Sequence, residues 1–142
     1  MKIQNSQMAQ RKLRQVMNLK MEEFWVIALS ADKKVLKEQC LFRGTIDTRL
    51  IHPRDIFRFA SLAKAHCLIV AHSHPFGEAF PSEDDLVLTE KLVIVSEQFQ
   101  IQILDHVILT KTSYFSFLDH GLIEPELFGA ERRAIRDLSC SE

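Results

Sequence analysis

The sequence predicts an α/β fold: a single three-layer domain in which a mixed, twisted β-sheet is flanked by helices. Short apolar runs, typical of buried strands, alternate along the chain with longer segments whose apolar residues recur at helical spacing. Strands and helices that alternate in this way favour a layered architecture. The length of 142 residues fits one domain, and 46% hydrophobic with 26% charged residues is an ordinary globular composition.

The first segment with a clear periodicity covers residues 5–20, where apolar residues lie among basic ones. This pattern predicts a short amphipathic helix with a basic face. Such a face is more typical of a solvated surface than of a nucleic-acid-binding arm. We therefore divide the chain into an N-terminal helix (residues 1–21), a main domain (residues 22–122) and a C-terminal tail (residues 123–142).

A strand hairpin and a helix are expected next. Phe24–Leu29 is apolar on both faces, which favours a fully buried strand. The polar residues 31–34 form a turn that leads to a partner strand over Val35–Phe42. Pro53 suits the first turn of a helix over residues 54–64.

The second half of the chain continues the alternation. A buried strand is expected over Cys67–Ala71, followed by a helix from Ser82 to about Phe99. A third buried strand then covers Ile101–Thr110, and Tyr114–Phe117 forms a short edge strand. The tail from Pro125 onward is expected to be helical or frayed.

Charge and cysteine content narrow the classes of function. The chain has 18 Lys and Arg against 19 Asp and Glu, so it lacks a global basic field for nucleic acid. Its three cysteines, Cys40, Cys67 and Cys140, include no CxxC pair, which favours a reducing cytoplasm over a disulfide framework. The chain opens without a signal-peptide pattern and its apolar runs are too short to cross a membrane, so we expect a cytoplasmic protein.

One stretch, from His72 to Asp85, carries residues suited to chemistry. His72 and His74 are two positions apart at the end of a buried strand, so their side chains point the same way. Two imidazoles side by side suit a divalent metal ion. The carboxyl ends of strands in α/β sheets are also where binding sites tend to lie.

Asp85 is a candidate third ligand. The helix after Ser82 has an apolar stripe at Leu88, Leu92, Val95 and Phe99. One step back along this stripe leads to Asp85, whose carboxylate would be costly to bury unless a metal ion paired with it. Ser82 followed by Asp85 also resembles a helix capping box, and taken alone the two roles of Asp85 have about equal weight.

Taken together, these residues resemble the JAMM metalloprotease motif: the sequence HSHP begins at His72, and ten residues separate His74 from Asp85. More narrowly, the chain resembles the RadC-like JAB domain over roughly residues 20–122. The blocks that carry this resemblance, in order, are Glu22-Glu23-Phe24, Arg43-Gly44-Thr45, His52-Pro53-Arg54-Asp55, the stretch from His72 to Asp85, Asp105-His106 and Ser116-Phe117.

The resemblance implies the JAB/MPN fold, which is cytidine-deaminase-like, and a zinc ion (Zn²⁺) held by His72, His74, Asp85 and a water. It also implies a glutamate that acts on this water. The family places that glutamate two residues before the phenylalanine, which selects Glu22, because neighbouring strand residues face opposite ways.

The same resemblance implies roles for the residues around this glutamate. It leaves Glu23 as a solvated charge at the strand entry, and it assigns Ser82 to stabilisation of the oxyanion. Two positions depart from the usual RadC-like pattern of Asn and Ser: here they are Ser73 and Phe76. Ser73 is common in other JAMM peptidases. Phe76 would narrow the mouth of the site or contact a substrate side chain.

The function expected from the resemblance is zinc-dependent hydrolysis of a peptide or isopeptide bond in a peptide or protein substrate. The alternatives are a RadC-like factor of DNA repair or mobile elements, and a metal-stabilised scaffold without turnover. Residues 1–21 leave no room for a helix-hairpin-helix segment, which counts against direct DNA binding. A zinc deaminase fits less well because it needs cysteine ligands. Asp105 and His106 interrupt an apolar strand and are expected to be a buried hydrogen-bonded pair, with a supporting role at the metal site left open.

Overall fold

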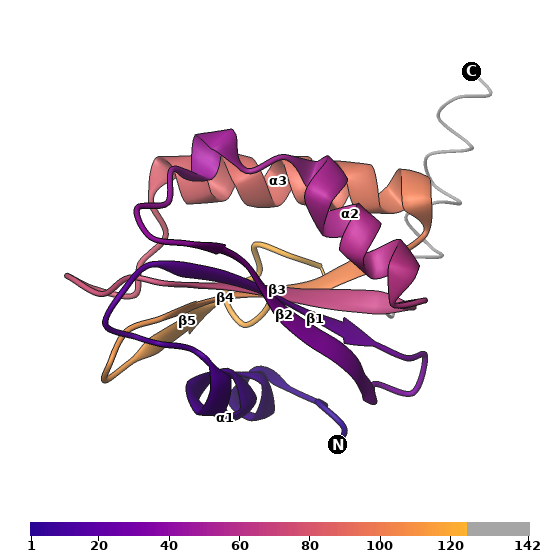
Figure 1. The fold of residues 1–142 in the computed structure, drawn as a ribbon, viewed down its shortest axis with the longest axis horizontal. Helices are drawn as coiled ribbons and strands as arrows, with labels where there is room; N and C mark the ends of the chain where they lie inside the picture. Colours follow the sequence, from indigo (N-terminus) through magenta and orange to yellow (C-terminus); the bar gives the residue numbers. More distant parts are fainter. Residues whose placement is uncertain (125–142) are drawn as a thin grey trace.

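The computed structural model describes residues 1–124, so the predicted tail from Pro125 onward, with Cys140, lies outside the described residues. Within them, the strands form one five-stranded sheet of order β2-β1-β3-β4-β5 (Figure 1). The strands are β1 (Glu23–Leu29), β2 (Val35–Arg43), β3 (Cys67–Ser73), β4 (Gln102–Leu109) and β5 (Tyr114–Ser116). The helices are α1 (Ser6–Val16), α2 (Pro53–Leu62) and α3 (Glu83–Phe99), with a 3₁₀ turn, η1 (Thr48–Leu50), before α2.

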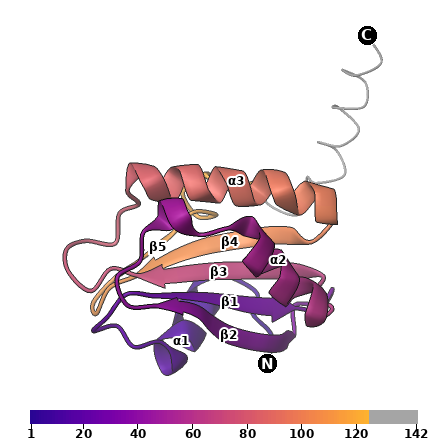
Figure 2. The same ribbon diagram turned by 45° about the horizontal axis from the view of Figure 1, so that its top comes forward.

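The helices form layers on both faces of the sheet. Helix α1 covers one face, and α2 and α3 lie together over the other (Figures 1 and 2). This arrangement confirms the predicted three-layer α/β fold with a mixed sheet. The boundaries of the predicted strands also agree with the observed ones to within two residues.

The strand directions bring the start of β1, the end of β3 and the start of α3 to the same end of the sheet. Strand β1 pairs antiparallel with both β2 and β3, and β3 pairs parallel with β4 through the α3 crossover. The start of β1 therefore lies beside the end of β3, with Phe24 opposite His72. Helix α3 is the next element after β3, joined to it by residues 74–82, and its first turn lies at the same end of the sheet, since Asp85 contacts His72 and His74.

The two faces of the sheet bury separate hydrophobic clusters because successive strand residues point to opposite sides. Val26 and Ala28 of β1 pack with Phe57, Leu88 and other residues beneath α2 and α3. Ile27 and Leu29 of the same strand pack with Leu13 and other residues beneath α1. Within residues 1–124, no helix combines the length and apolar character needed to span a membrane.

Helix α3 follows the predicted stripe only over its first half. Asp85, Leu88 and Leu92 are buried, as expected. Val95 is only partly buried and Phe99 is 52% exposed. The Phe99 ring stacks on the ring of Phe57 of α2, with centroids 5.1 Å apart. The stripe therefore seats α3 on the sheet near the start of the helix, which is the end that carries Asp85.

Candidate metal centre

The structure brings His72, His74 and Asp85 together at the end of the sheet where β3 ends and α3 begins. Their potential ligand atoms all lie within 4.8 Å of one another, so the three residues could hold a metal ion. The two Nε2 atoms of the histidines are 3.0 Å apart. Each lies 3.3 Å from a different carboxylate oxygen of Asp85. His72 and Asp85 are almost fully buried, whereas His74 is partly exposed.

Asp85 takes part in the capping box and in the cluster at the same time. Its Oδ2 accepts a hydrogen bond from the backbone N–H of Ser82 at 2.9 Å, and the Ser82 Oγ accepts one from the backbone N–H of Asp85 at 3.1 Å. The two roles predicted as alternatives are therefore compatible. The cap holds the carboxylate at the helix start, with both oxygens toward the histidines.

A chain of hydrogen bonds determines which nitrogen of His72 carries its proton. The Thr89 hydroxyl donates to the backbone carbonyl of Asp85 at 2.9 Å, so its oxygen is left to accept from His106 Nδ1 at 2.6 Å. The His106 Nε2 then carries a lone pair and accepts from His72 Nδ1 at 2.8 Å. Full burial lowers the pKa of His106 well below its usual range, which keeps its ring neutral. The Nε2 of His72 is therefore left with a lone pair.

His74 reaches the same state by a different bond. Its Nδ1 lies 3.1 Å from the backbone carbonyl of Glu78, an acceptor, so Nδ1 carries the proton and Nε2 carries a lone pair. Two lone pairs and a carboxylate therefore converge on one point. Such a donor set requires a cation between its members, either a shared proton or a metal ion, and it fits zinc.

The pKa shifts reflect the demand for positive charge. Burial acts to raise the pKa of Asp85. When protons rather than a metal ion supply the positive charge, Nε2 of His72 and of His74 carry them and donate hydrogen bonds to the carboxylate, which outweighs burial and holds that pKa well below its usual range. The hydrogen bond to Asp85 raises the pKa of His74, and the nearby charge of Glu22 adds to this effect.

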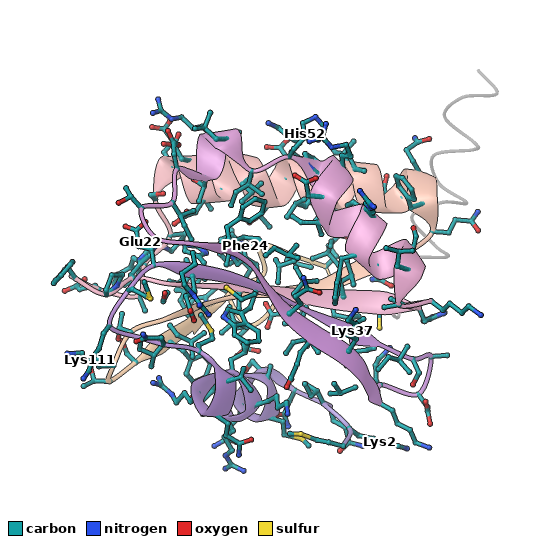
Figure 3. The ribbon with its side chains drawn as sticks, viewed as in Figure 1. Lys2, Glu22, Phe24, Lys37, His52 and Lys111 are labelled. Atoms are coloured by element: carbon teal, nitrogen blue, oxygen red, sulfur yellow. The ribbon has the colours of Figure 1, made fainter. Side chains whose placement is uncertain are left out.

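Glu22 lies just before β1 and lines the same pocket as the cluster (Figure 3). Its carboxylate accepts a hydrogen bond from the backbone N–H of Ile46, and its carbonyl accepts one from Gly44 at 3.0 Å. On either side of it, Ser73 Oγ donates to the Met21 carbonyl and accepts from the N–H of Glu23, at 2.7 and 2.9 Å. Ser73 thus clamps the backbone that presents Glu22 to the pocket.

The pocket has a volume of about 260 Å³ and brings together all five predicted site residues. They are Glu22, His72, His74, Ser82 and Asp85. Phe76 does not line this pocket and its side chain is 89% exposed, so it does not narrow the mouth. The Ser82 hydroxyl accepts its capping bond with a lone pair, which leaves its O–H free to donate.

The prediction that Glu23 is a solvated charge is wrong. Glu23 is 1% exposed, and its carboxylate accepts hydrogen bonds from Arg43 Nε at 2.7 Å and Trp25 Nε1 at 2.9 Å. A third bond comes from the backbone N–H of Asn18 at 2.7 Å. Trp25 lies two residues further along β1, whereas Arg43 lies on the neighbouring strand β2 and Asn18 on the segment after α1. The bonds from Arg43 and Asn18 depend on tertiary packing, so no local pattern predicted them. Glu23 thus joins the first residue of β1 to β2 and to the segment after α1.

Three supporting residues gained no definite role from the sequence. The polar Thr89 stands one turn after Asp85 on the buried face of α3, and this spacing was a usable signal. His106 was expected to pair with Asp105, but only its backbone N–H bonds to that carboxylate, at 2.7 Å, while its ring supports His72. Ser73 gave no signal, since its partners depend on how β1 and β3 pair.

Comparison of the sequence with known proteins identifies the family of the chain. A protein-family model described as the RadC-like JAB domain matches residues 3–122. A UPF0758 protein of Symbiobacterium thermophilum is 38% identical over 106 residues, covering 75% of this chain and 45% of the relative. A UPF0758 protein of Thermotoga maritima is 38% identical over 120 residues, covering 84% and 54%. The chain thus spans about half the length of the curated relatives it matches.

Proposed function

The chain belongs to the RadC-like JAB domain family, and from this premise we propose that it is a zinc-dependent metallohydrolase that cleaves a peptide or isopeptide bond. The observation that carries the proposal is the convergence of two imidazole lone pairs and the Asp85 carboxylate beside Glu22 in one pocket. Three protein ligands leave a fourth position open, which is typical of a catalytic rather than a structural zinc.

His72, His74 and Asp85 would hold the ion through two Nε2 atoms and a carboxylate oxygen. The ion would supply Lewis acidity, which lowers the pKa of water to about 7 and polarises a carbonyl group. The family resemblance favours zinc, although a His₂Asp set also accepts other divalent metals.

The roles of the other two residues follow from where they lie. Glu22 takes a proton from the attacking water and later passes it to the leaving amine, so the carboxylate is regenerated. The Ser82 O–H donates a hydrogen bond to the oxygen that becomes negative when the carbonyl is attacked. The amide C–N bond then breaks, and the products are a carboxylic acid and an amine.

The test separates metal binding from turnover. Elemental mass spectrometry of the purified protein should find about one zinc per chain in the wild type and in Glu22→Gln, but none in His74→Ala. A library of linear peptides and lysine-branched peptides should be cleaved by the wild type only. Equal cleavage by Glu22→Gln and the wild type would reject Glu22 as the base, and a zinc-free wild type would reject the whole proposal.

The family match is compatible with the RadC-like alternative, but the contacts of the described residues favour neither alternative function. The basic face of α1 is partly engaged within the protein, since Arg14 donates to the carbonyls of Thr110 and Ser113, and Lys12 lies 3.2 Å from Glu38. A nucleic-acid arm would need these groups free. The reason to expect a scaffold without turnover was that Phe76 would obstruct access to the site. That side chain does not line the pocket, so this reason is removed.

A further inference from the structure

A second hollow lies between α2 and α3, on the face of the sheet that these two helices cover. It has a volume of about 800 Å³, which is within the range of ligand-binding clefts. Its apolar floor includes Phe57, Val95 and Phe99. Figure 3 shows His52, which lines the same hollow, at the start of α2. We call this hollow the α2–α3 groove.

The rim of the α2–α3 groove carries only positive charge. Arg54 and Arg58 stand one turn apart on α2, and Lys91 faces them from α3. No aspartate or glutamate of the described residues lines the groove. Arg54 contacts Asp55 at 3.3 Å, but within residues 1–124 neither Arg58 nor Lys91 forms an ion pair. This local excess of cations stands out in a chain whose formal net charge is −1.

The groove adjoins the hydrolytic pocket, because η1 forms the wall between them. Asp47 and Thr48 line the pocket, whereas Arg49 and Leu50 line the groove. Arg49 also bridges the two, since its guanidinium lies 2.8 Å from Asp47 and 3.8 Å from Asp84 at the pocket. If a segment of a substrate were held in the groove, the peptide bonds adjacent to that segment would be kept close to the pocket, at a high effective concentration.

We propose that the α2–α3 groove docks an acidic segment with apolar side chains that belongs to the protein substrate. This inference rests on the proposed hydrolytic function and adds a substrate class to it. Apolar side chains of the segment would cover the floor, and its carboxylates would pair with Arg58 and Lys91. Helix α2 is about 15 Å long, which matches four or five residues of an extended segment.

A polypeptide fits this surface better than a nucleic acid does. Single-stranded nucleic acids bind through aromatic rings whose faces are free for stacking. Here Phe57 is only 1% exposed and its ring is stacked on Phe99 at an interplanar angle of 14°. Phe99 is 52% exposed, but one face of its ring lies against Phe57. The groove thus combines apolar lining residues with charges at its rim, which is the pattern that an acidic amphipathic segment complements.

The test uses the zinc-loaded full chain and two labelled octapeptides. In one, Leu and Glu alternate; in its twin, Gln replaces Glu. Fluorescence anisotropy should show the Glu peptide binding at least tenfold more tightly than the Gln peptide. The double variant Arg58→Glu with Lys91→Glu should weaken binding of the Glu peptide at least tenfold.

The matched control reverses two exposed cations elsewhere, with Arg11→Glu and Lys20→Glu, and should leave binding unchanged. Zinc content and thermal unfolding, measured for every variant, ensure that a loss of binding does not come from misfolding. Equal weakening by both double variants would overturn the proposal, as would tighter binding of a labelled oligo-dT that the groove variant abolishes.

The design distinguishes failure of the docking proposal from failure of the hydrolase proposal, because peptide binding is measured without turnover. Docking without hydrolysis of any library peptide would count against the hydrolase only. Hydrolysis that is unchanged in the groove variant, with no binding of the Glu peptide, would count against the docking site only.

Discussion

Two buried carboxylates in this protein, Asp85 and Asp105, have opposite surroundings. Both are buried, with exposed fractions of 2% and 3%. Asp85 faces the ring nitrogens of two histidines, which hold its pKa well below the usual range. Asp105 faces neutral donors only: the Ser116 hydroxyl at 2.6 Å and the backbone N–H groups of Leu118 and His106 at 3.0 and 2.7 Å. Burial outweighs these bonds and raises the pKa of Asp105 to about 6.

The difference separates a candidate metal site from a structural anchor. Asp105 has its hydrogen bonds completed by neighbouring backbone and by Ser116, so it needs nothing from outside the chain. Asp85 instead receives one hydrogen bond from the backbone N–H of Ser82 and otherwise faces the ring nitrogens of His72 and His74. When these nitrogens carry lone pairs, their repulsion with the carboxylate is relieved by a cation. Burial of a carboxylate alone therefore does not indicate a metal site; what indicates it is the kind of atom the carboxylate faces.

The strongest test of this contrast replaces each carboxylate by its amide. Asp85→Asn keeps the side-chain shape and the capping acceptor but removes the charge, and we expect it to lower zinc affinity by more than about 100-fold, beyond the usual effect of a residue that only supports a ligand. Asp105→Asn should retain zinc within about threefold. Competition with a fluorescent chelator measures both. Similar losses in the two variants would remove the distinction.

The next test uses pH. Because the pKa of Asp105 is raised from 3.8 to about 6 in the folded protein, the folded state holds this proton more tightly than the unfolded state does. The stability that this group contributes is full below about pH 4 and is lost as pH rises toward 6, by up to about 3 kcal/mol. Urea unfolding at pH 4 to 7 should therefore show Asp105→Asn gaining stability relative to the wild type as pH rises. A difference that stays constant with pH would contradict the shift.

A smaller effect on zinc affinity is expected from substitutions in the hydrogen-bond chain that supports His72. His106→Phe keeps an aromatic ring to stack on Phe117, whose centroid lies 4.5 Å away, but removes the acceptor for His72 Nδ1. Zinc affinity should fall about 10- to 100-fold with the fold retained. Thr89→Val, which acts one bond further away, should cause a smaller loss. Affinity unchanged in His106→Phe would show that the hydrogen-bond chain does not orient His72.

Much of the site was readable from local patterns. The spacing of His72 and His74 on a strand predicted that their rings point the same way, and the buried stripe of α3 predicted the inward carboxylate of Asp85. The capping box was also predicted, because Ser82 and Asp85 interact within one helical turn. Glu22 was selected through the family resemblance, and the structure places it at the same pocket.

Other features depend on how distant segments pack. The partners of Glu23, the clamp from Ser73 to the Glu22 backbone, and the bond between His72 and His106 join residues that are up to 52 positions apart. Such pairs depend on strand register and on the seating of α3, which no periodicity encodes. The α2–α3 groove is of the same kind, because its walls come from three elements that meet only in the folded chain.

Local spacing and hydrogen bonding therefore determined the elements, the three-layer class and the candidate ligand triad. Each rests on interactions within a few residues or on which side of an element faces the core. Packing determined which partners the ring nitrogens of the histidines face, the burial of Glu23 and the charged groove beside the pocket. These features follow from which side chains meet across the sheet, and burial then makes the identity of each neighbour decide the charge it can carry.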